Sequence, residues 1–341
     1  MRSIGDTVLL TPSLIALRRF LPDAEIDVLL EDWVAPVLDG FPGVNIITVP
    51  KKAPNAFRLA TRRAKVARAL RAKKYDVVFD QHGGNPASFL ARASGARHRV
   101  GYDNYGYRYL FNHLVPSDLS FWGDRFVHSV ERQLALMGGV GVPVENAPDT
   151  LLTVTSAAMD SLLIKLEQIE FKIDQPFAVV HPVGAFETKR WPIERYARIV
   201  DHLHERGFAS IAVGSPSDNE ALRELSRQCK APFWFSGEIN LPETTALLSK
   251  AAFFVGNDSG IAHMAAAMKV PSVVLFGSMD PRSWRPWTTA PNEILYEPLP
   301  CHPCSKPICE AFDEPKCILE VTTEQTIDAV DRILAASASL Q

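Results

Sequence analysis

Small polar residues separate an apolar run from an Ala-rich run in the segment GNDSGIAH, residues 256–263. The apolar run is typical of a strand and the Ala-rich run of a helix, so the segment marks a strand-to-helix turn. Glycine lets such a turn approach a ligand closely, and the N–H groups of the first helical turn can bind an anion. Asp258 or Ser259 can also be an ordinary helix cap, so phosphate binding and simple capping both stay open.

The segment SIGDTVLLTP, residues 3–12, is a matching turn near the N-terminus. Its Gly-Asp pair would point one carboxylate, that of Asp6, into a ligand cleft. A carboxylate that faces a phosphate site can act as the general base for a sugar hydroxyl. The alternative is that Asp6 caps a helix that begins near Thr7.

A third turn, GAFETKRWPIERYARIV at residues 184–200, places Thr188, Lys189 and Arg190 just before a helix. Cations at this place can neutralise a departing diphosphate, a task that many transferases give to a metal ion. The alternative is a solvated basic pair. The sequence contains no Asp-x-Asp pattern for a nucleotide-bound metal, so we expect no catalytic metal and no cofactor beyond the donor substrate.

Other polar residues give weaker indications. Glu220 follows a predicted strand and could reach a ribose or sugar hydroxyl, whereas the nearby Asp218 is better explained as a cap. His82 ends a predicted strand and could line the cleft. His128 and Glu131 lie about one helical turn apart, and we interpret His128 as a packing residue on a helix face.

Four of the five cysteines crowd into CHPCSKPICEAFDEPKC, residues 301–317. Their spacing leaves three interpretations open: a structural zinc site, stabilising or transient disulfides, and free thiols. The clustered cysteines are Cys301, Cys304, Cys309 and Cys317.

Short apolar runs alternate with longer amphipathic runs along the chain, which predicts parallel strands joined by helices. This pattern indicates an α/β fold with doubly wound sheets. In the first half, predicted strands span 24–31, 44–49, 75–81 and 98–102, and predicted helices span 11–21, 55–74, 86–95 and 125–143. In the second half, predicted strands span 177–182, 210–215, 232–237, 252–257, 272–277 and 293–298. Predicted helices there span 157–171, 193–206, 218–229, 242–250 and 261–268.

This pattern predicts two Rossmann-like domains, residues 1–150 and 151–341, facing one cleft. Ligands of such sheets bind beyond the carboxyl ends of the strands, where the three turns above lie. The first domain begins with a turn and a helix, so its first strand is apparently missing. Either the sheet lacks this strand or the natural start lies about ten residues upstream and supplies it, and we favour the second interpretation.

The composition excludes several classes of protein. The 341 residues are 47% hydrophobic and 22% charged, a balance typical of a globular protein. The formal net charge of −3 provides no overall positive potential that would attract nucleic acid. No apolar run is long enough to span a bilayer. These properties indicate a cytoplasmic protein. The basic segment 58–74 could contact anionic lipid or acceptor phosphates, and a solvated helix face is the alternative.

The two long motifs, SIGDTVLLTPSLIALRRFLPDAEIDVLL and FFVGNDSGIAHMAAAMKVPSVVLFG, resemble glycosyltransferase family 9, the ADP-heptose–lipopolysaccharide heptosyltransferases. Three further segments also resemble parts of that family: HSVERQLALMGGVGV, TKRWPIERYARI and the Cys-rich segment. The resemblance implies the GT-B architecture, with the acceptor in the N-terminal domain and the donor in the C-terminal one. It further implies an inverting, metal-independent transfer of a sugar from ADP-heptose.

The same resemblance implies roles for individual residues. Asp6 matches the catalytic base, Thr188 and Lys189 match contacts to the donor phosphates, and Asp258 matches the carboxylate that contacts the donor sugar. The backbone near Leu241 would lie beside the adenine. The residues on the diphosphate side would be Ser259, Gly260 and His263.

We therefore expect transfer of heptose to a lipid-linked core saccharide of lipopolysaccharide, with peripheral contact at the inner face of the cytoplasmic membrane. Two alternatives stay open. One is a GT-B enzyme for another nucleotide sugar or acceptor, and the other is a non-catalytic saccharide-binding or assembly protein of the same fold. A Rossmann oxidoreductase is not expected, because neither half contains a G-x-G-x-x-G turn.

Overall fold

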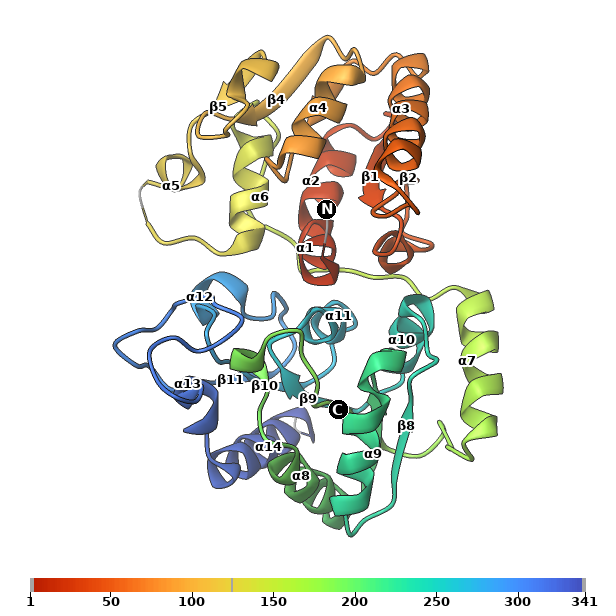
Figure 1. The fold of residues 1–341 in the computed structure, drawn as a ribbon. Helices are drawn as coiled ribbons and strands as arrows, with labels where there is room; N and C mark the ends of the chain where they lie inside the picture. Colours follow the sequence, from red (N-terminus) through yellow and green to blue (C-terminus); the bar gives the residue numbers. More distant parts are fainter. Residues whose placement is uncertain (1–2, 124, 339–341) are drawn as a thin grey trace. The chain divides into compact units, whose positions relative to one another are not determined.

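Parallel strands form from the apolar runs and helices from the amphipathic runs in the computed structural model of the chain (Figure 1). The structure describes residues 3–123 and 125–338. The chain divides into two units, Met1–Thr150 and Leu151–Gln341. Among the described residues, no helix combines the length and the apolar character needed to cross a bilayer.

Unit 1 contains two parallel sheets, one of β1 and β2 and one of β3, β4 and β5. Its strands are β1 (Asp27–Glu31), β2 (Asn45–Val49), β3 (Val77–Phe79), β4 (His98–Tyr102) and β5 (His113–Val115). Its helices are α1 (Ile4–Leu9), α2 (Thr11–Phe20), α3 (Ala56–Ala72), α4 (Asn85–Ala93), α5 (Asp118–Phe121) and α6 (Ser129–Gly138).

The structure corrects the alternative in which Asp6 caps a helix that begins near Thr7, and it adds a short helix before the one predicted over 11–21. Helix α1 begins at Ile4, and Asp6 lies in its first turn. Ser3 is the N-cap, because its Oγ accepts a hydrogen bond from the Asp6 N–H at 3.0 Å and donates one to Asp6 Oδ2 at 2.7 Å. Of the polar residues in this predicted turn, Ser3 is therefore the helix cap and Asp6 belongs to the helix.

The helix that we predicted over 125–143 is also shorter. Helix α6 begins at Ser129 with His128 as its N-cap. The His128 Nδ1 accepts from the Val130 N–H at 3.1 Å, and Glu131 Oε2 accepts from the His128 N–H at 2.9 Å. His128 thus caps the helix and does not lie on its face.

Unit 2 contains one parallel sheet of six strands in the order β11-β10-β9-β6-β7-β8. Its strands are β6 (Phe177–His181), β7 (Ala209–Val213), β8 (Phe233–Ser236), β9 (Phe253–Asn257), β10 (Ser272–Leu275) and β11 (Asn292–Leu295). Its helices are α7 (Ser156–Gln168), α8 (Ile193–Glu205), α9 (Asn219–Gln228), α10 (Leu241–Leu248), α11 (Gly260–Ala267), α12 (Pro281–Trp284), α13 (Lys316–Leu319) and α14 (Thr323–Ala338).

The central strands of this sheet are buried along their whole length. Every residue of β6, β9 and β10 is buried, as expected for parallel strands covered by helices on both faces. The strand order changes direction between β6 and β9, because the chain builds β7 and β8 on one side of β6 before it crosses to the other side. Such a switch point is where open α/β sheets bind ligands.

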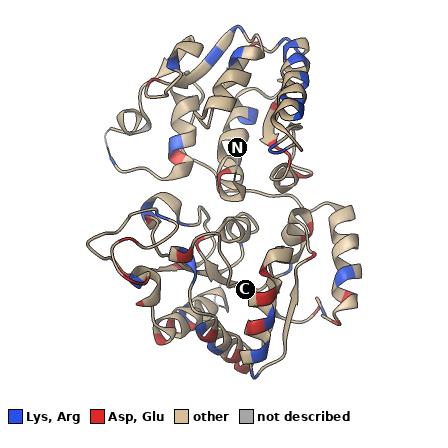
Figure 2. Ribbon diagram, in the orientation of Figure 1, with Lys and Arg blue, Asp and Glu red and all other residues tan. Residues whose placement is uncertain are grey.

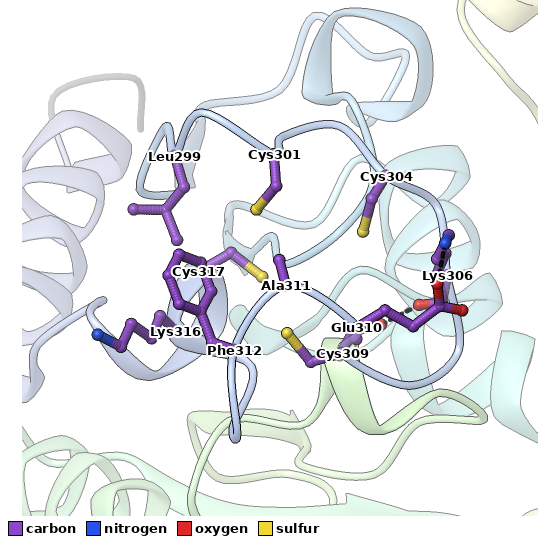
Figure 3. Close-up of a pocket in the computed structure, with 11 residues that line it drawn as sticks. Leu299, Cys301, Cys304, Lys306, Cys309, Glu310, Ala311, Phe312, Lys316 and Cys317 are labelled. Atoms are coloured by element: carbon purple, nitrogen blue, oxygen red, sulfur yellow. Dashed lines mark hydrogen bonds and ion pairs between the residues drawn. The ribbon is translucent and has the colours of Figure 1, made fainter.

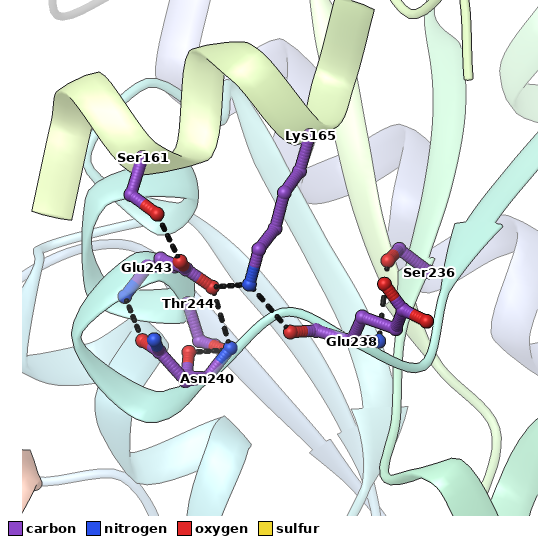
Figure 4. A network of polar contacts seen from close by, with 7 residues as sticks. All are labelled: Ser161, Lys165, Ser236, Glu238, Asn240, Glu243 and Thr244. Atoms are coloured by element: carbon purple, nitrogen blue, oxygen red, sulfur yellow. Dashed lines mark hydrogen bonds and ion pairs between the residues drawn. The ribbon is translucent and has the colours of Figure 1, made fainter. Parts of the chain in front are cut away.

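A buried carboxylate joins α7 to the start of α10 (Figure 4). Glu243 accepts hydrogen bonds from Lys165 Nζ, from Ser161 Oγ and from the Asn240 N–H, each at 2.7 Å. Burial alone would raise the pKa of Glu243, but these hydrogen bonds outweigh it and lower the pKa below its usual range. The network fixes the N-terminus of α10 and with it the backbone at Leu241.

Candidate functional site

Two strands end side by side at the switch point of unit 2. Strand β6 ends at His181 and β9 at Asn257, and His181 pairs with Gly256 across the parallel ladder. A Cβ atom on Gly256 would lie 3.0 Å from the His181 backbone oxygen, so glycine suits this close packing. The turns that follow the two strands therefore start next to each other.

Asn257 holds the β9 turn against the β6 turn. Its Oδ1 accepts hydrogen bonds from the Tyr196 hydroxyl at 2.8 Å and from the Trp191 N–H at 3.3 Å. Its Nδ2 donates to the Pro182 backbone oxygen at 2.9 Å. All of these groups are buried, so the Asn257 side chain joins the two turns inside the protein and does not face a ligand.

An ion pair crosses between the two turns. Lys189 Nζ lies 2.6 Å from Asp258 Oδ2, with the side chains 17% and 4% exposed. Burial raises the pKa of Asp258, and the lysine opposes that shift only in part. The structure thus brings together two residues that the sequence suggested separately, and it holds a cation beside the start of α11.

Ser259 caps α11 and contacts β6. Its Oγ accepts from the Ala262 N–H at 3.3 Å and lies 3.3 Å from His181 Nδ1. With the Ala262 N–H held by this cap, the N–H groups of Gly260 and Ile261 lie at the first turn, where a helix offers no acceptor of its own. These groups and the helix dipole favour an anion at this point.

Two histidines are buried near this turn. Burial lowers the pKa of His181 to about 4, so its ring is neutral at physiological pH. His263 lies one turn into α11 and is 4% exposed.

Thr188 is buried and its hydroxyl is engaged. Thr188 Oγ1 lies 2.8 Å from Ser278 Oγ, and it also donates to the Lys306 backbone oxygen. A Cβ atom on Gly277 would lie 1.8 Å from the Thr188 backbone oxygen. The turn after β10 and the Cys-rich segment therefore hold the turn that carries Lys189.

Two other predicted residues lie elsewhere in unit 2. Leu241 is the first residue of α10, directly after the N-cap Asn240. Glu220 lies in the first turn of α9, where its exposed carboxylate pairs with Arg223 at 3.4 Å and Arg227 at 3.0 Å. The described contacts do not join Glu220 to the Lys189–Asp258 pair.

The four clustered cysteines line one cavity of about 230 Å³ (Figure 3). Their thiols are free, and burial raises the pKa of Cys317 to about 11. Within residues 3–123 and 125–338, no group of three His, Cys, Asp or Glu side chains stands at metal-ligand spacing. The cavity lies beside Lys306, whose backbone oxygen accepts a hydrogen bond from Thr188.

In unit 1, Asp6 lies in α1 as described above, and His82 lies in the turn after β3. Asp80 organises this turn, because its Oδ1 accepts from the His82 and Gly83 N–H groups at 3.0 Å each. Asp80 Oδ2 accepts from Ser88 Oγ at 2.9 Å.

Sequence reasoning missed three residues that shape the site. They are His181, Gly277 and Ser278, which contact the turns after β6 and β9. His181 carried a usable signal, because it lies at the carboxyl end of the strand predicted over 177–182. Gly277 and Ser278 carried none, since their role depends on a contact with Thr188 about 90 residues away.

Comparison with known proteins gives consistent results. The model of glycosyltransferase family 9 (heptosyltransferase) matches residues 63–312. Lipopolysaccharide heptosyltransferase 3 of Escherichia coli K12 is 29% identical over 298 residues, which cover 84% of each chain.

Solved structures are similar over nearly the whole chain. A glycosyl transferase family 9 structure from Veillonella parvula has a TM-score of 0.84 at 22% identity, covering 98% of this chain and 95% of that one. The ADP-heptose LPS heptosyltransferase II of E. coli has a TM-score of 0.79 at 22% identity, covering 99% and 98%. The chain therefore shares the α/β fold of these structures.

Proposed function

The chain belongs to glycosyltransferase family 9, the heptosyltransferases, and on this basis we propose that it transfers heptose from ADP-heptose to a lipopolysaccharide core saccharide. The names of its relatives support this donor and this acceptor. The observation that carries the proposal is the Lys189–Asp258 pair beside the first turn of α11, at the switch point of the sheet.

The donor diphosphate binds at the N-terminus of α11 in this proposal. The N–H groups of Gly260 and Ile261 donate to its oxygens, and Lys189 supplies a positive charge as the leaving group becomes more negative. Asp258 orients Lys189 and contacts the donor sugar. The backbone at Leu241 lies beside the adenine, and Thr188 positions the turn that carries Lys189.

The transfer itself is a single displacement with inversion. The acceptor hydroxyl oxygen forms a bond to the anomeric carbon as the bond from that carbon to the phosphate oxygen breaks. ADP leaves with the electron pair, and the Asp6 carboxylate takes the hydroxyl proton. Unit 1 then presents the acceptor and unit 2 the donor, at the inner face of the cytoplasmic membrane.

Glu220 and His263 are the two remaining residues proposed to act at the donor site. A hydrogen bond from a donor ribose hydroxyl to Glu220 would compete with its pairs to Arg223 and Arg227. His263 belongs to the same helix as the proposed diphosphate site and would support it from the buried side.

The proposal is tested by the identity of the product. Purified protein is incubated with ADP-heptose and a panel of truncated core saccharides, and the products are analysed by mass spectrometry. We expect a mass increase of one heptose on a core saccharide, with UDP-sugars failing to compete for the donor site. Efficient transfer from a UDP-sugar would contradict the donor, and donor binding without transfer to any acceptor would favour a non-catalytic role.

A further inference from the structure

Positive charge is concentrated in one segment of unit 1. Residues 51–74 contain ten Lys and Arg and no Asp or Glu, in a chain with a formal net charge of −3. Unit 1 has 19 Lys and Arg against 15 Asp and Glu, whereas unit 2 has 17 against 24. Figure 2 shows these basic residues along α3 (Ala56–Ala72).

Helix α3 packs weakly against the rest of unit 1. Leu70 is the only buried residue of its 17. Arg58, Arg62 and Lys65 are all exposed, and their i, i+4, i+7 spacing places them on one face. Like charges at this spacing repel each other, so this face would be stabilised by an anionic partner.

These cations are not used by the protein itself. Within the part of the chain that the structure describes, Arg58, Arg62, Lys65 and Arg68 form no ion pair. Lys73, just after the helix, differs, since it pairs with Glu25 at 2.7 Å and with Asp27 at 2.9 Å. The free cations therefore lie toward the start and middle of α3.

An aromatic side chain accompanies the free cations. Phe57 is 77% exposed, the largest exposed fraction among the large hydrophobic residues described. It shares a helix face with Lys65 and Arg68, at spacings of i+8 and i+11. A helix face with cations and an exposed aromatic ring is typical of a peripheral membrane contact, where the ring enters the headgroup region.

We propose that this basic surface, defined as Phe57, Arg58, Arg62, Lys65 and Arg68, docks unit 1 on an anionic phospholipid bilayer. A 17-residue helix is about 25 Å long, so its cations can meet several headgroups at once. One phosphorylated saccharide would reach only part of the row. The proposal rests on the membrane location given in the proposed function and names the surface that makes the contact, and it does not depend on the identity of the donor.

Vesicle flotation tests the proposal directly. The full chain is mixed with phosphatidylcholine vesicles that contain a minority of phosphatidylglycerol, and with vesicles of phosphatidylcholine alone. We expect binding only to the anionic vesicles, and we expect it to fall steeply as salt is added. Binding that is equal on both kinds of vesicle would overturn the proposal.

Charge reversal locates the contact. The triple variant Arg58→Glu, Arg62→Glu, Lys65→Glu should bind anionic vesicles at least about 100-fold more weakly, because each cation near such a surface contributes about fivefold or more. The variant Phe57→Ser should weaken binding with little change in its salt dependence.

A matched control separates local contact from total charge. The variant Lys172→Glu, Lys230→Glu, Lys250→Glu changes the net charge equally but reverses three exposed lysines of unit 2. It should bind anionic vesicles as the wild type does. Equal weakening in both triple variants would overturn the proposed surface.

Two further measurements distinguish loss of membrane binding from misfolding and from loss of transferase activity. All five α3 residues are exposed, so the variants should keep the wild-type circular dichroism and melting temperature. Transfer to a delipidated soluble acceptor should also be unchanged in the α3 triple variant, so failure of docking can be told from failure of the proposed function. Loss of transfer to the soluble saccharide with vesicle binding intact would assign these cations to the acceptor and overturn the membrane contact.

Discussion

Lys189 and Asp258 form an ion pair with an almost fully buried carboxylate, and the proposed transfer depends on its cation. Replacing Lys189 by Met removes the charge that opposes the departing diphosphate. We expect kcat to fall about 100-fold, as when one preorganised electrostatic group is lost. Steady-state kinetics with ADP-heptose measures this, with Lys172→Met as the control at an exposed lysine of the same unit.

The single variant also leaves a buried carboxyl without its cation, which costs about 3–5 kcal/mol when a buried pair is broken. The double variant Lys189→Met, Asp258→Asn removes both charges and should recover much of the melting temperature. It should remain as slow as the single variant, and wild-type kcat in either would refute the role of Lys189.

Asp6 has two possible roles, a catalytic base and a partner of the Ser3 cap, and two variants separate them. Asp6→Asn keeps the side-chain shape but removes the base, so turnover should fall about 100-fold or more while donor affinity is kept. Ser3→Ala removes the cap, so it should lower stability by about 1 kcal/mol with most turnover kept. Steady-state kinetics measures turnover, donor titration measures donor affinity and thermal melts measure stability for both variants. Turnover that survives Asp6→Asn would leave Asp6 with the structural role alone.

Because His181 is buried with a lowered pKa, we expect the free energy of unfolding to decrease at acidic pH. Its pKa is about 4 in the folded chain and near 6.5 when unfolded, so the unfolded state binds more protons below pH 6.5. The stabilisation is therefore complete above about pH 6.5 and is lost as the pH falls toward 4, by about 3 kcal/mol in total. Denaturant unfolding at several pH values should show a shallower pH dependence for His181→Asn than for wild type. Parallel curves would show that His181 does not cause the loss.

At the scale of elements, three turns support one another: those after β6, β9 and β10. Gly277→Ala would push a Cβ atom against the Thr188 backbone oxygen, at 1.8 Å in the present geometry. We expect a loss of about 1–3 kcal/mol from this overpacking, together with weaker donor binding as the Lys189 turn shifts. Thermal melts and ADP titration measure the two effects.

Gly106→Ala serves as the control for this substitution, because a Cβ atom there meets nothing within 4 Å. It should change neither stability nor ADP affinity. If Gly277→Ala were equally silent, the close approach of the β10 turn to Thr188 would not matter for the site.

Much of the fold could be predicted from the sequence. All six strands of unit 2 and the helices α7 to α11 are confirmed within a few residues, because buried parallel strands are continuous apolar runs and the helices are clearly amphipathic. Short β5 was missed, since two of its three residues are exposed and no apolar run marks it. The long α14 was also missed, although it packs on α8 and β10.

The site was predictable in part, for a physical reason. Lys189 and Asp258 each follow a strand, and strand exits are visible in a sequence. Their mutual contact is not visible, because it requires β6 and β9 to be neighbours although the chain crosses β7 and β8 between them. The contacts of Thr188 and His181 depend on the same crossing.

The whole molecule has the α/β fold of the GT-B heptosyltransferases, with parallel sheets in both units. In the proposed mechanism, Lys189 and the first turn of α11 supply the charge stabilisation that other transferases obtain from a metal ion. We therefore expect turnover to persist in excess EDTA. Loss of activity in EDTA that Mg²⁺ restores would contradict this part of the mechanism.

A crystal structure of the full chain with ADP tests the central claim most directly. We predict the β-phosphate within hydrogen-bond distance of the Gly260 or Ile261 N–H, with Lys189 Nζ at the diphosphate. A diphosphate bound away from the start of α11 and from Lys189 would contradict the account.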